Sequence, residues 1–524
     1  MELTGKLLLG DSFVKGSGGS FKGFNPTTSM EMFPEFYGAS VEEVSTACRL
    51  ADESFQAFRA TSLEERANFL ETVADELEKL KSSIVARGVQ ETGLPEGRLQ
   101  GELGRTTGQL RLFAKVVRDG GYLDVRIDEA MPDRTPPRPD LRLVNIPVGP
   151  VVVFGASNFP LAFSVAGGDT ASAWAAGCPV IVKAHSAHPG TSELVAKAIV
   201  AAVKHCNMPT GVFSMLFAAS RDVGTALVAD PRVKAVGFTG SRQGGLALQA
   251  IAQSRAEPIP VYAEMSSINP VILMPEAMQQ KAAGIAQAFV GALTLGAGQF
   301  CTNPGLVLAV EDPSLELFKE EVAKGLANSA AATMLTAGIC EAYQSGVRAL
   351  KANQNVSCVG EGMNAEGVVC QAHVFEVGGA NFLADETLQD EVFGAASLIV
   401  KCESVSQLRE IITILEGQLT ISVHADAGDE PEVRALLPLL MDKAGRVLFD
   451  GFGTGVEVCD AMVHGGPYPS TTAPATSSVG SIAIKRFLRP VCFQNLPPSL
   501  MMPEISSENS AGIPQRVNGG LKIG

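Results

Sequence analysis

The sequence lacks the cysteine and histidine spacings that mark disulfide-linked or zinc-binding modules. Its 10 cysteines are widely scattered, with no Cys-x-x-Cys pair and no histidine at zinc-finger spacing. This pattern excludes a disulfide framework and predicts no metal site. A surplus of basic residues is also lacking, because the net charge is −15. We therefore expect neither nucleic acid nor an anionic membrane as a partner, and an anionic substrate would need a local cationic pocket.

The sequence also gives no reason to expect a secretory signal or a transmembrane helix. Glu2 follows Met1 directly, and only a short apolar run comes after it, so we expect no signal peptide. Residues 143–168 carry no charged side chain and are long enough to cross a bilayer, but prolines and glycines interrupt them. We expect there a short buried strand, a loop and a helix, in a protein of the reducing cytoplasm.

What the chain does contain is the composition of a large globular protein. With 524 residues, 46% of them hydrophobic and 19% charged, it is too long for a single core and predicts two or three domains. Helical periodicity begins at residue 41 and continues to about residue 117. A Pro-rich run at residues 131–139 can be neither a helix nor a central strand.

Strands and helices then alternate along the chain. We predict buried strands at residues 151–154, 179–182, 212–217 and 233–238, with helices at residues 163–176, 191–205, 221–229 and 243–253. This spacing favours parallel crossovers and hence a doubly wound α/β sheet. A second alternating region follows Glu264, the segment 451–480 is loop-like, and residues 487–494 form an extended strand.

The residues that carry chemistry centre on Cys301, in the segment Gly-Gln-Phe-Cys-Thr-Asn-Pro-Gly at residues 298–305. A cysteine among small and apolar residues is usually only a compact core residue. Upstream of it, however, lie Asn158 and Glu264, and downstream lies Glu391 in Glu-Val-Phe-Gly. In this order the motifs resemble those of the aldehyde dehydrogenase superfamily, and the resemblance spans nearly the whole chain.

The resemblance implies a fold of three parts. A Rossmann-type cofactor-binding domain is expected from residues 1–120, 145–264 and 455–488, and an α/β catalytic domain from residues 265–454. Residues 121–144 and 489–524 are expected to form a small β oligomerisation element. Such a chain is expected to assemble as a homodimer or homotetramer.

The catalytic roles follow from the same resemblance. Cys301 is expected to attack the aldehyde carbon, and Asn158 is expected to stabilise the oxyanion together with the backbone N–H of the cysteine. Glu264 is expected to activate water against the thioester, which favours hydrolysis to a free acid. Phe159 is expected on the substrate side of the site.

A nicotinamide cofactor needs its pyrophosphate held at a helix N-terminus, yet the usual Gly-x-Gly-x-x-Gly fingerprint is absent. Gly240, Ser241 and Gly245 instead follow a predicted strand and open a helix. A glycine at each end of this hexapeptide is the form that the resemblance implies. Glu391 and Phe393 resemble the motif that orients the nicotinamide ribose and ring, although alanine replaces the usual proline two residues later.

Three further residues concern the adenosine end of the cofactor, and two of them predict NADP, with NAD as a possible substitute. Lys183 ends a predicted strand, where the superfamily places a lysine on the adenine ribose. Ser186 stands where NAD-specific members carry an acidic residue, so a carboxylate that would repel the 2′-phosphate is lacking. Arg221 follows the next strand and is expected to pair with that phosphate.

His464, in His-Gly-Gly-Pro-Tyr-Pro, stands where most of the superfamily has no histidine. It is either a loop residue bonded to the backbone or a group that approaches Cys301 and tunes the thiol. Two other classes therefore stay open: a cysteine hydrolase that uses Cys301 and His464, and a non-catalytic nucleotide-binding scaffold. The strand–helix alternation weighs against the hydrolase, and the retained catalytic motifs weigh against the scaffold.

The substrate expected from the resemblance is a short aldehyde with a carboxylate at its far end, best matched by α-ketoglutarate semialdehyde. A fatty aldehyde is the alternative. Arg105 and Arg111 lie on one predicted helix, six residues apart and so on different faces. We expect Arg105 to face the substrate and Arg111 to be a solvated or structural charge.

Overall fold

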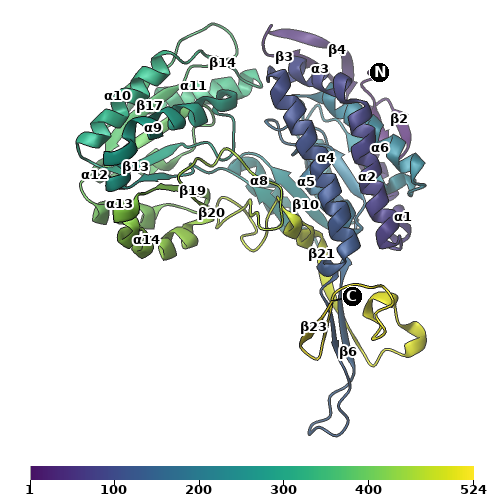
Figure 1. The fold of residues 1–524 in the computed structure, drawn as a ribbon. Helices are drawn as coiled ribbons and strands as arrows, with labels where there is room; N and C mark the ends of the chain where they lie inside the picture. Colours follow the sequence, from purple (N-terminus) through teal and green to yellow (C-terminus); the bar gives the residue numbers. More distant parts are fainter. Residues whose placement is uncertain (1, 524) are drawn as a thin grey trace.

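The computed structural model describes residues 2–523, which form two lobes and a narrow projection (Figure 1). Each lobe is built on a seven-stranded sheet, and the projection is built on a five-stranded sheet. The expected α/β fold with a doubly wound sheet is confirmed. The division into cofactor-binding, catalytic and oligomerisation parts stays a prediction.

The sheet of the first lobe has the strand order β11-β10-β7-β8-β9-β1-β2. Its first five strands are parallel, whereas β1 and β2 form an antiparallel edge. The strands are β1 (Leu7–Leu9), β2 (Ser12–Val14), β7 (Val151–Phe154), β8 (Val180–Lys183), β9 (Phe213–Leu216), β10 (Ala235–Thr239) and β11 (Val261–Glu264). Strands β7 and β9 are fully buried, and β7 is a continuous apolar run, as expected where helices cover both faces of a sheet.

Helices α1 to α8 surround this sheet. They are α1 (Val41–Arg59), α2 (Leu63–Lys79), α3 (Lys81–Thr92), α4 (Glu96–Asp119), α5 (Gly168–Ala176), α6 (Pro189–His205), α7 (Asp222–Ala229) and α8 (Arg242–Gln253). Capping boxes at Ser40 and Ser62 start α1 and α2, and left-handed glycines Gly93 and Gly120 end α3 and α4, as helix-end chemistry requires.

One predicted boundary was wrong. The sequence predicts a helix from residue 163, but α5 begins only at Gly168. The carboxylate of Glu102 on α4 accepts hydrogen bonds from the backbone N–H groups of Leu161 (2.8 Å) and Ala162 (2.9 Å). The carbonyl oxygens of Ala162 and Phe163 accept from the N–H groups of Gly168 (3.1 Å) and Ala156 (2.9 Å) and so make no helical bonds, and the segment stays a loop.

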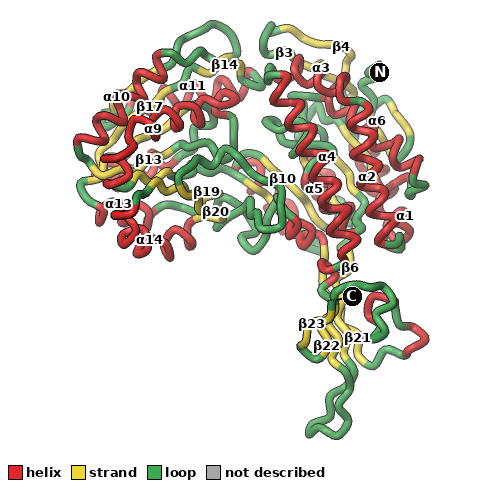
Figure 2. The backbone as a smooth tube through the Cα atoms, in the orientation of Figure 1, coloured by secondary structure: helices red, strands yellow, loops and turns green. Residues whose placement is uncertain are grey.

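The second lobe has the strand order β15-β17-β18-β13-β12-β19-β20, parallel except for β15. Its strands are β12 (Val271–Leu273), β13 (Leu306–Val310), β15 (Ser357–Glu361), β17 (His373–Gly378), β18 (Ala396–Cys402), β19 (Gln418–His424) and β20 (Ala444–Phe449). Its helices are α9 (Pro275–Thr294), α10 (Pro313–Ala327), α11 (Ala337–Ala352), α12 (Gly379–Ala384), α13 (Val405–Ile414) and α14 (Glu430–Lys443). After β20 the chain returns toward the first lobe as a long irregular segment, residues 450–480 (Figure 2).

The projection joins segments from the middle and the end of the chain. Its sheet has the order β21-β6-β5-β22-β23, from β5 (Val125–Asp128), β6 (Leu141–Pro147), β21 (Leu488–Gln494), β22 (Gln515–Val517) and β23 (Gly520–Lys522). Two small sheets pair β3 (Ser20–Asn25) with β4 (Met30–Tyr37), and β14 (Ala332–Thr333) with β16 (Val369–Cys370). Within residues 2–523, no helix combines the length and apolarity needed to span a membrane.

Candidate active site

The carboxyl edge of the first sheet gathers the predicted functional segments. In the strand register Phe154 lies beside Lys183, and Thr239 lies beside Glu264. The loop that carries Asn158, the loop after Lys183 and the turn that opens α8 therefore leave the sheet at one edge. Ligands of open α/β sheets bind along this edge.

Cys301 enters the site from the second lobe, on the loop between α9 and β13. The side-chain amide of Asn269 donates hydrogen bonds to the carbonyl oxygens of Cys301 (2.8 Å) and Asn303 (2.9 Å). Gly298 has φ +68°, and a Cβ there would lie 2.3 Å from the backbone of Ala395. The thiol loop is thus clamped from two sides, which holds the sulfur in one place.

His464 approaches the thiol, which is one of the two interpretations that the sequence left open. Its Nε2 lies 3.4 Å from Cys301 Sγ and 3.3 Å from Glu264 Oε2. The imidazole and the carboxylate are buried, with 1% and 3% of their side chains exposed. A cysteine hydrolase needs the thiol on one ring nitrogen of the histidine and the carboxylate on the other. Here the sulfur and the carboxylate both face Nε2, which weighs against the cysteine hydrolase.

The environment of Cys301 disfavours its charged form. Burial raises the pKa of the thiol well above its ordinary value, and the nearby carboxylates of Glu264 and Glu391 raise it further. The guanidinium of Arg105 acts in the opposite direction. The resting enzyme therefore holds mostly the neutral thiol at physiological pH.

Asn158 lies beside the thiol loop. Its side-chain amide donates a hydrogen bond to the carbonyl oxygen of Gln299 (3.1 Å), two residues before Cys301. The guanidinium of Arg98 donates a hydrogen bond to the backbone carbonyl oxygen of Asn158 (3.4 Å). The second N–H of the Asn158 side-chain amide is left to donate to an oxyanion, which is the role predicted for it.

Aromatic rings surround the approach to the sulfur. Phe159 packs edge-on against Phe163 and Phe300, with ring centroids 5.2 and 5.5 Å apart, and Phe163 lies 5.9 Å from the His464 ring. The guanidinium of Arg105 lies over Phe163, 5.2 Å from the ring centroid. Phe159 and Arg105 thus lie together near the thiol, where the sequence predicts the substrate.

Arg105 and Arg111 differ as the sequence predicts. Arg111 binds Asp75 and Glu78 at the surface, with 41% of its side chain exposed. Arg105 points inward, where burial lowers its pKa and its charge interacts with Glu102 and Cys301. Its buried Nε and Nη2 have no hydrogen-bond partner in the described chain. Two unsatisfied guanidinium nitrogens predict an anionic ligand.

Arg446 is a second cation that the sequence analysis missed. It lies on β20 and donates hydrogen bonds to the carbonyl oxygens of Gly453 (2.6 Å) and Gly455 (2.7 Å). Its charge interacts with Cys301 and with Arg105. No motif surrounds Arg446 in the sequence, and only its position in the second sheet brings it to the thiol.

The turn after β10 fits a pyrophosphate. Ser241 caps α8, since its hydroxyl accepts a hydrogen bond from the Gly244 backbone N–H (3.2 Å). Gly240 is exposed, and a Cβ on Gly245 would lie 2.7 Å from the sulfur of Met265 and 3.1 Å from Cβ of Ala263. Gly245 therefore lets α8 pack closely on β11, while Gly240 and Ser241 leave the helix N-terminus open to an anion.

The residues predicted to bind the adenosine end of the cofactor lie along the same edge of the sheet. Lys183 pairs with Leu216 in the strand register, so the loops after β8 and β9 leave side by side. Burial lowers the pKa of Lys183. Ser186 and Arg221 are exposed on these two loops, and Arg221 directly precedes α7.

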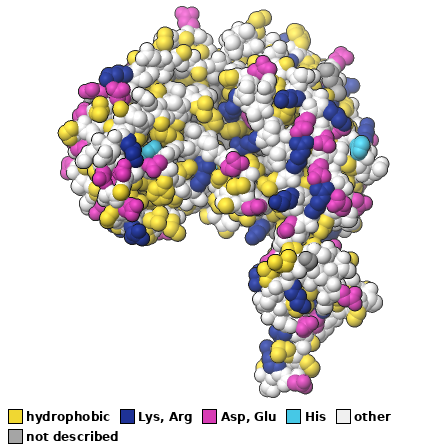
Figure 3. Space-filling view, in the orientation of Figure 1, with side chains coloured by type: hydrophobic (Ala, Val, Ile, Leu, Met, Phe, Trp, Pro, Cys, Tyr) yellow, Lys and Arg dark blue, Asp and Glu magenta, His cyan; other side chains and the backbone are white. Residues whose placement is uncertain are grey.

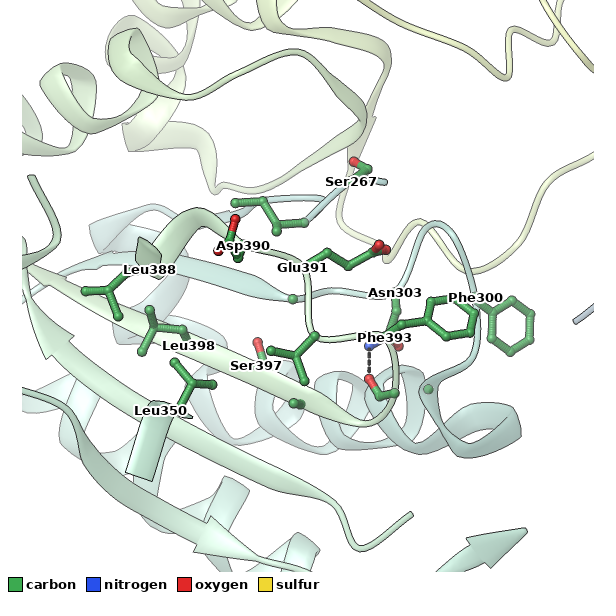
Figure 4. Close-up of a pocket in the computed structure, with 16 residues that line it drawn as sticks. Ser267, Phe300, Asn303, Leu350, Leu388, Asp390, Glu391, Phe393, Ser397 and Leu398 are labelled. Carbon is green, nitrogen blue, oxygen red and sulfur yellow. Dashed lines mark hydrogen bonds between the residues drawn. The ribbon is translucent and has the colours of Figure 1, made fainter. Parts of the chain in front are cut away.

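Glu391 and Phe393 line a pocket next to the thiol loop, together with Ser267, Phe300 and Asn303 (Figure 4). Leucines gather at one end of this pocket, whereas Glu391 and Asn303 lie toward the other. Burial raises the pKa of Glu391 to about 7, with the Glu264 charge adding to the effect and hydrogen bonds from Ser266 and Ser267 opposing it. The pocket offers a carboxylate acceptor and an aromatic ring, as a ribose and a nicotinamide ring require.

Comparisons with known proteins agree with this geometry. The sequence model of the aldehyde dehydrogenase family matches residues 13–428. The chain is 54% identical to α-ketoglutaric semialdehyde dehydrogenase 2 of Azospirillum brasilense and 45% identical to the α-ketoglutaric semialdehyde dehydrogenase of Acinetobacter baylyi, each over 99% of both chains. The fold is similar to that of betaine aldehyde dehydrogenase from Staphylococcus aureus in complex with NAD+, with a TM-score of 0.81 and 17% identity over 95% of this chain and 97% of that one.

Proposed function

Since this chain belongs to the aldehyde dehydrogenase family, we propose that it oxidises α-ketoglutarate semialdehyde to α-ketoglutarate, with NADP as the preferred cofactor. The family uses NAD or NADP, and NAD is a possible substitute here. Two relatives that match over the full chain are named for this semialdehyde. The observation that carries the substrate is the inward guanidinium of Arg105.

The first half-reaction uses Cys301 and Asn158. The thiolate of Cys301 attacks the aldehyde carbon, and the Asn158 amide donates a hydrogen bond to the oxygen as it gains negative charge. The cofactor, when bound, supplies a nicotinamide ring that accepts the hydride. The thiohemiacetal on Cys301 thereby becomes a thioester.

The second half-reaction uses Glu264. Its buried carboxylate can take a proton from water, which then attacks the thioester carbon and releases the acid from Cys301. His464 contacts both groups and is assigned to holding the carboxylate beside the sulfur. Hydrolysis regenerates the thiol and yields a free carboxylic acid.

Arg105 supports a substrate with a distal carboxylate. Its Nε and Nη2 are buried without a hydrogen-bond partner among residues 2–523, and its charge reaches Cys301. In a protein of net charge −15, such a cation next to the nucleophile recruits an anionic aldehyde and not a fatty one. Arg446 adds a second positive charge that acts on Cys301.

The test compares two aldehydes of equal length, α-ketoglutarate semialdehyde and pentanal. For Arg105→Ala, kcat/KM for the acidic aldehyde should fall roughly 30- to 1,000-fold, which corresponds to a loss of about 2–4 kcal/mol in transition-state stabilisation. The value of kcat/KM for pentanal should change little. The rate is followed by the absorbance of the reduced nicotinamide.

The matched control is Arg111→Ala, which removes the same charge from the outer face of the same helix. It should leave both values of kcat/KM within a few-fold of the original enzyme. Equal losses on both aldehydes with Arg105→Ala, or a preference of the unaltered enzyme for long uncharged aldehydes, would move the assignment to a fatty-aldehyde dehydrogenase.

A further inference from the structure

Three side chains of different chemistry converge on one buried point. Cys301 Sγ, His464 Nε2 and a Glu264 carboxylate oxygen all lie within 4.8 Å of one another. The mechanism proposed above uses the thiol and the carboxylate, but it gives the histidine no step of its own. The three positions are far apart in the sequence, so no spacing motif indicates that they meet.

Two of the three separations match those of ligands on a zinc ion, and the third, between the sulfur and the carboxylate oxygen, is at most 4.8 Å and would shorten to the same range on binding. Tetrahedral zinc holds sulfur at about 2.3 Å and nitrogen or oxygen at about 2.0–2.2 Å, so neighbouring ligand atoms lie about 3.3–3.6 Å apart. The sulfur–nitrogen distance here is 3.4 Å and the nitrogen–oxygen distance is 3.3 Å. A thiolate and a carboxylate also supply two negative charges, which balance Zn²⁺.

The ligands are held in place before any metal arrives. The His464 backbone N–H donates a hydrogen bond to Ser477 Oγ (3.0 Å), and its carbonyl oxygen accepts one from the Ser478 N–H (2.8 Å). Glu264 ends β11, and the Cys301 loop is clamped by Asn269. Within the described residues Nδ1 of His464 has no partner, so it can carry the ring proton while Nε2 presents its lone pair.

We propose that Cys301, His464 and Glu264 form a reversible inhibitory zinc site, with water as the fourth ligand on the substrate side. On binding, the thiol loses its proton to solvent and the sulfur lone pair forms the bond to Zn²⁺. A sulfur bound in this way cannot attack an aldehyde. Removal of the metal by a chelator returns the proton to the thiol and restores activity. The positive charges of Arg105 and Arg446 repel the ion, which limits its affinity and keeps binding reversible.

Cobalt(II) serves as the spectroscopic probe, because thiolate coordination produces an intense sulfur-to-cobalt charge-transfer band. The full-length enzyme without cofactor should bind about one Co²⁺ per chain with this band. Cys301→Ser should abolish the band, and His464→Gln should weaken Co²⁺ binding by at least about tenfold. The matched control is Cys358→Ser, which removes an exposed thiol beside Glu361, a carboxylate that itself lies 4.0 Å from His373, and should leave the band intact.

Zn²⁺ supplies the second measurement, on the unaltered enzyme. Stoichiometric Zn²⁺ should block dehydrogenation, EDTA should restore it, and Zn²⁺ should protect Cys301 from iodoacetamide in a peptide map. This measurement does not depend on the folding of any variant. A cobalt band that survives Cys301→Ser, or full alkylation of Cys301 in the presence of Zn²⁺, would overturn the proposal. Neither result bears on the aldehyde or the cofactor that the enzyme uses.

Discussion

At the scale of single residues, the thiol of Cys301 presents a conflict between placement and chemistry. The nucleophile must be a thiolate, yet burial and the carboxylates of Glu264 and Glu391 raise its pKa well above the ordinary value. In the proposed mechanism, a buried carboxylate beside the sulfur is what the second half-reaction needs. That mechanism therefore favours thioester hydrolysis at the expense of a ready thiolate in the resting enzyme.

Glu264→Gln tests this electrostatic conflict. Only the thiolate reacts with iodoacetamide, so in the unaltered enzyme the alkylation rate of Cys301 should climb steadily as pH rises through the alkaline range. The variant keeps the shape of the side chain but removes a charge that raises the thiol pKa. At a given pH it should be alkylated several-fold faster, measured by intact mass. Cys301→Ala is the blank for the other thiols. Slower alkylation in Glu264→Gln would mean that the carboxylate takes the proton from the thiol.

At the scale of elements, much of the fold could be predicted because local patterns determine it. The apolar run at residues 151–154 is β7 without any shift, and the helix predicted at residues 243–253 is α8 with one residue added. The helical pattern predicted over residues 41–117 did not separate α3 from its neighbours, because α3 buries only two large apolar side chains, Ile84 and Val85. The start of α5 was wrong, because the carboxylate that satisfies its loop, Glu102, belongs to another helix.

The site could be predicted only where a motif marks it. Cys301, Glu264 and Asn158 stand in recognisable segments, and the structure brings them to one place. Arg446 stands in no such segment, and its relation to Cys301 depends on the packing of β20 and on the loop that follows it. The contact of His464 with the thiol joins residues 163 positions apart, so the sequence left it as one of two interpretations and the folded chain decides between them.

The prediction on cofactor choice concerns the loops that follow β8 and β9. Ser186 is exposed after β8, and Arg221 is exposed after the neighbouring β9. Ser186→Glu should place a carboxylate near the 2′-phosphate of NADP and lower the ratio of kcat/KM for NADP over NAD roughly tenfold or more. Ser186→Gln has a similar size without the charge and should leave the ratio nearly unchanged. If both variants behave alike, or if neither alters the ratio, this loop does not bind the phosphate.

At the scale of the whole molecule, the projection leaves an unusually large surface. The isolated chain exposes 20749 Å², whereas a compact monomer of 54.8 kDa is expected to expose about 18,000 Å². The excess comes with a five-stranded sheet that stands away from both lobes (Figure 1). Hydrophobic side chains lie on the surface of this projection, among charges of both signs (Figure 3). An exposed sheet of this kind is typical of a surface that pairs with another subunit.

We therefore predict that the projection joins subunits into a homodimer or homotetramer. Leu500 and Leu521, in the chain segments that build the projection, are 66% and 60% exposed. The double substitution Leu500→Glu and Leu521→Glu places two like charges on an apolar contact and should shift the mass measured by sedimentation or light scattering toward that of one chain. Met441→Glu is the matched control, since Met441 is 65% exposed on α14 of the second lobe and its substitution should leave the mass unchanged. An oligomer that withstands the double substitution but dissociates with Met441→Glu would place the subunit contact on the lobe, and a monomeric unaltered enzyme would exclude the assembly altogether.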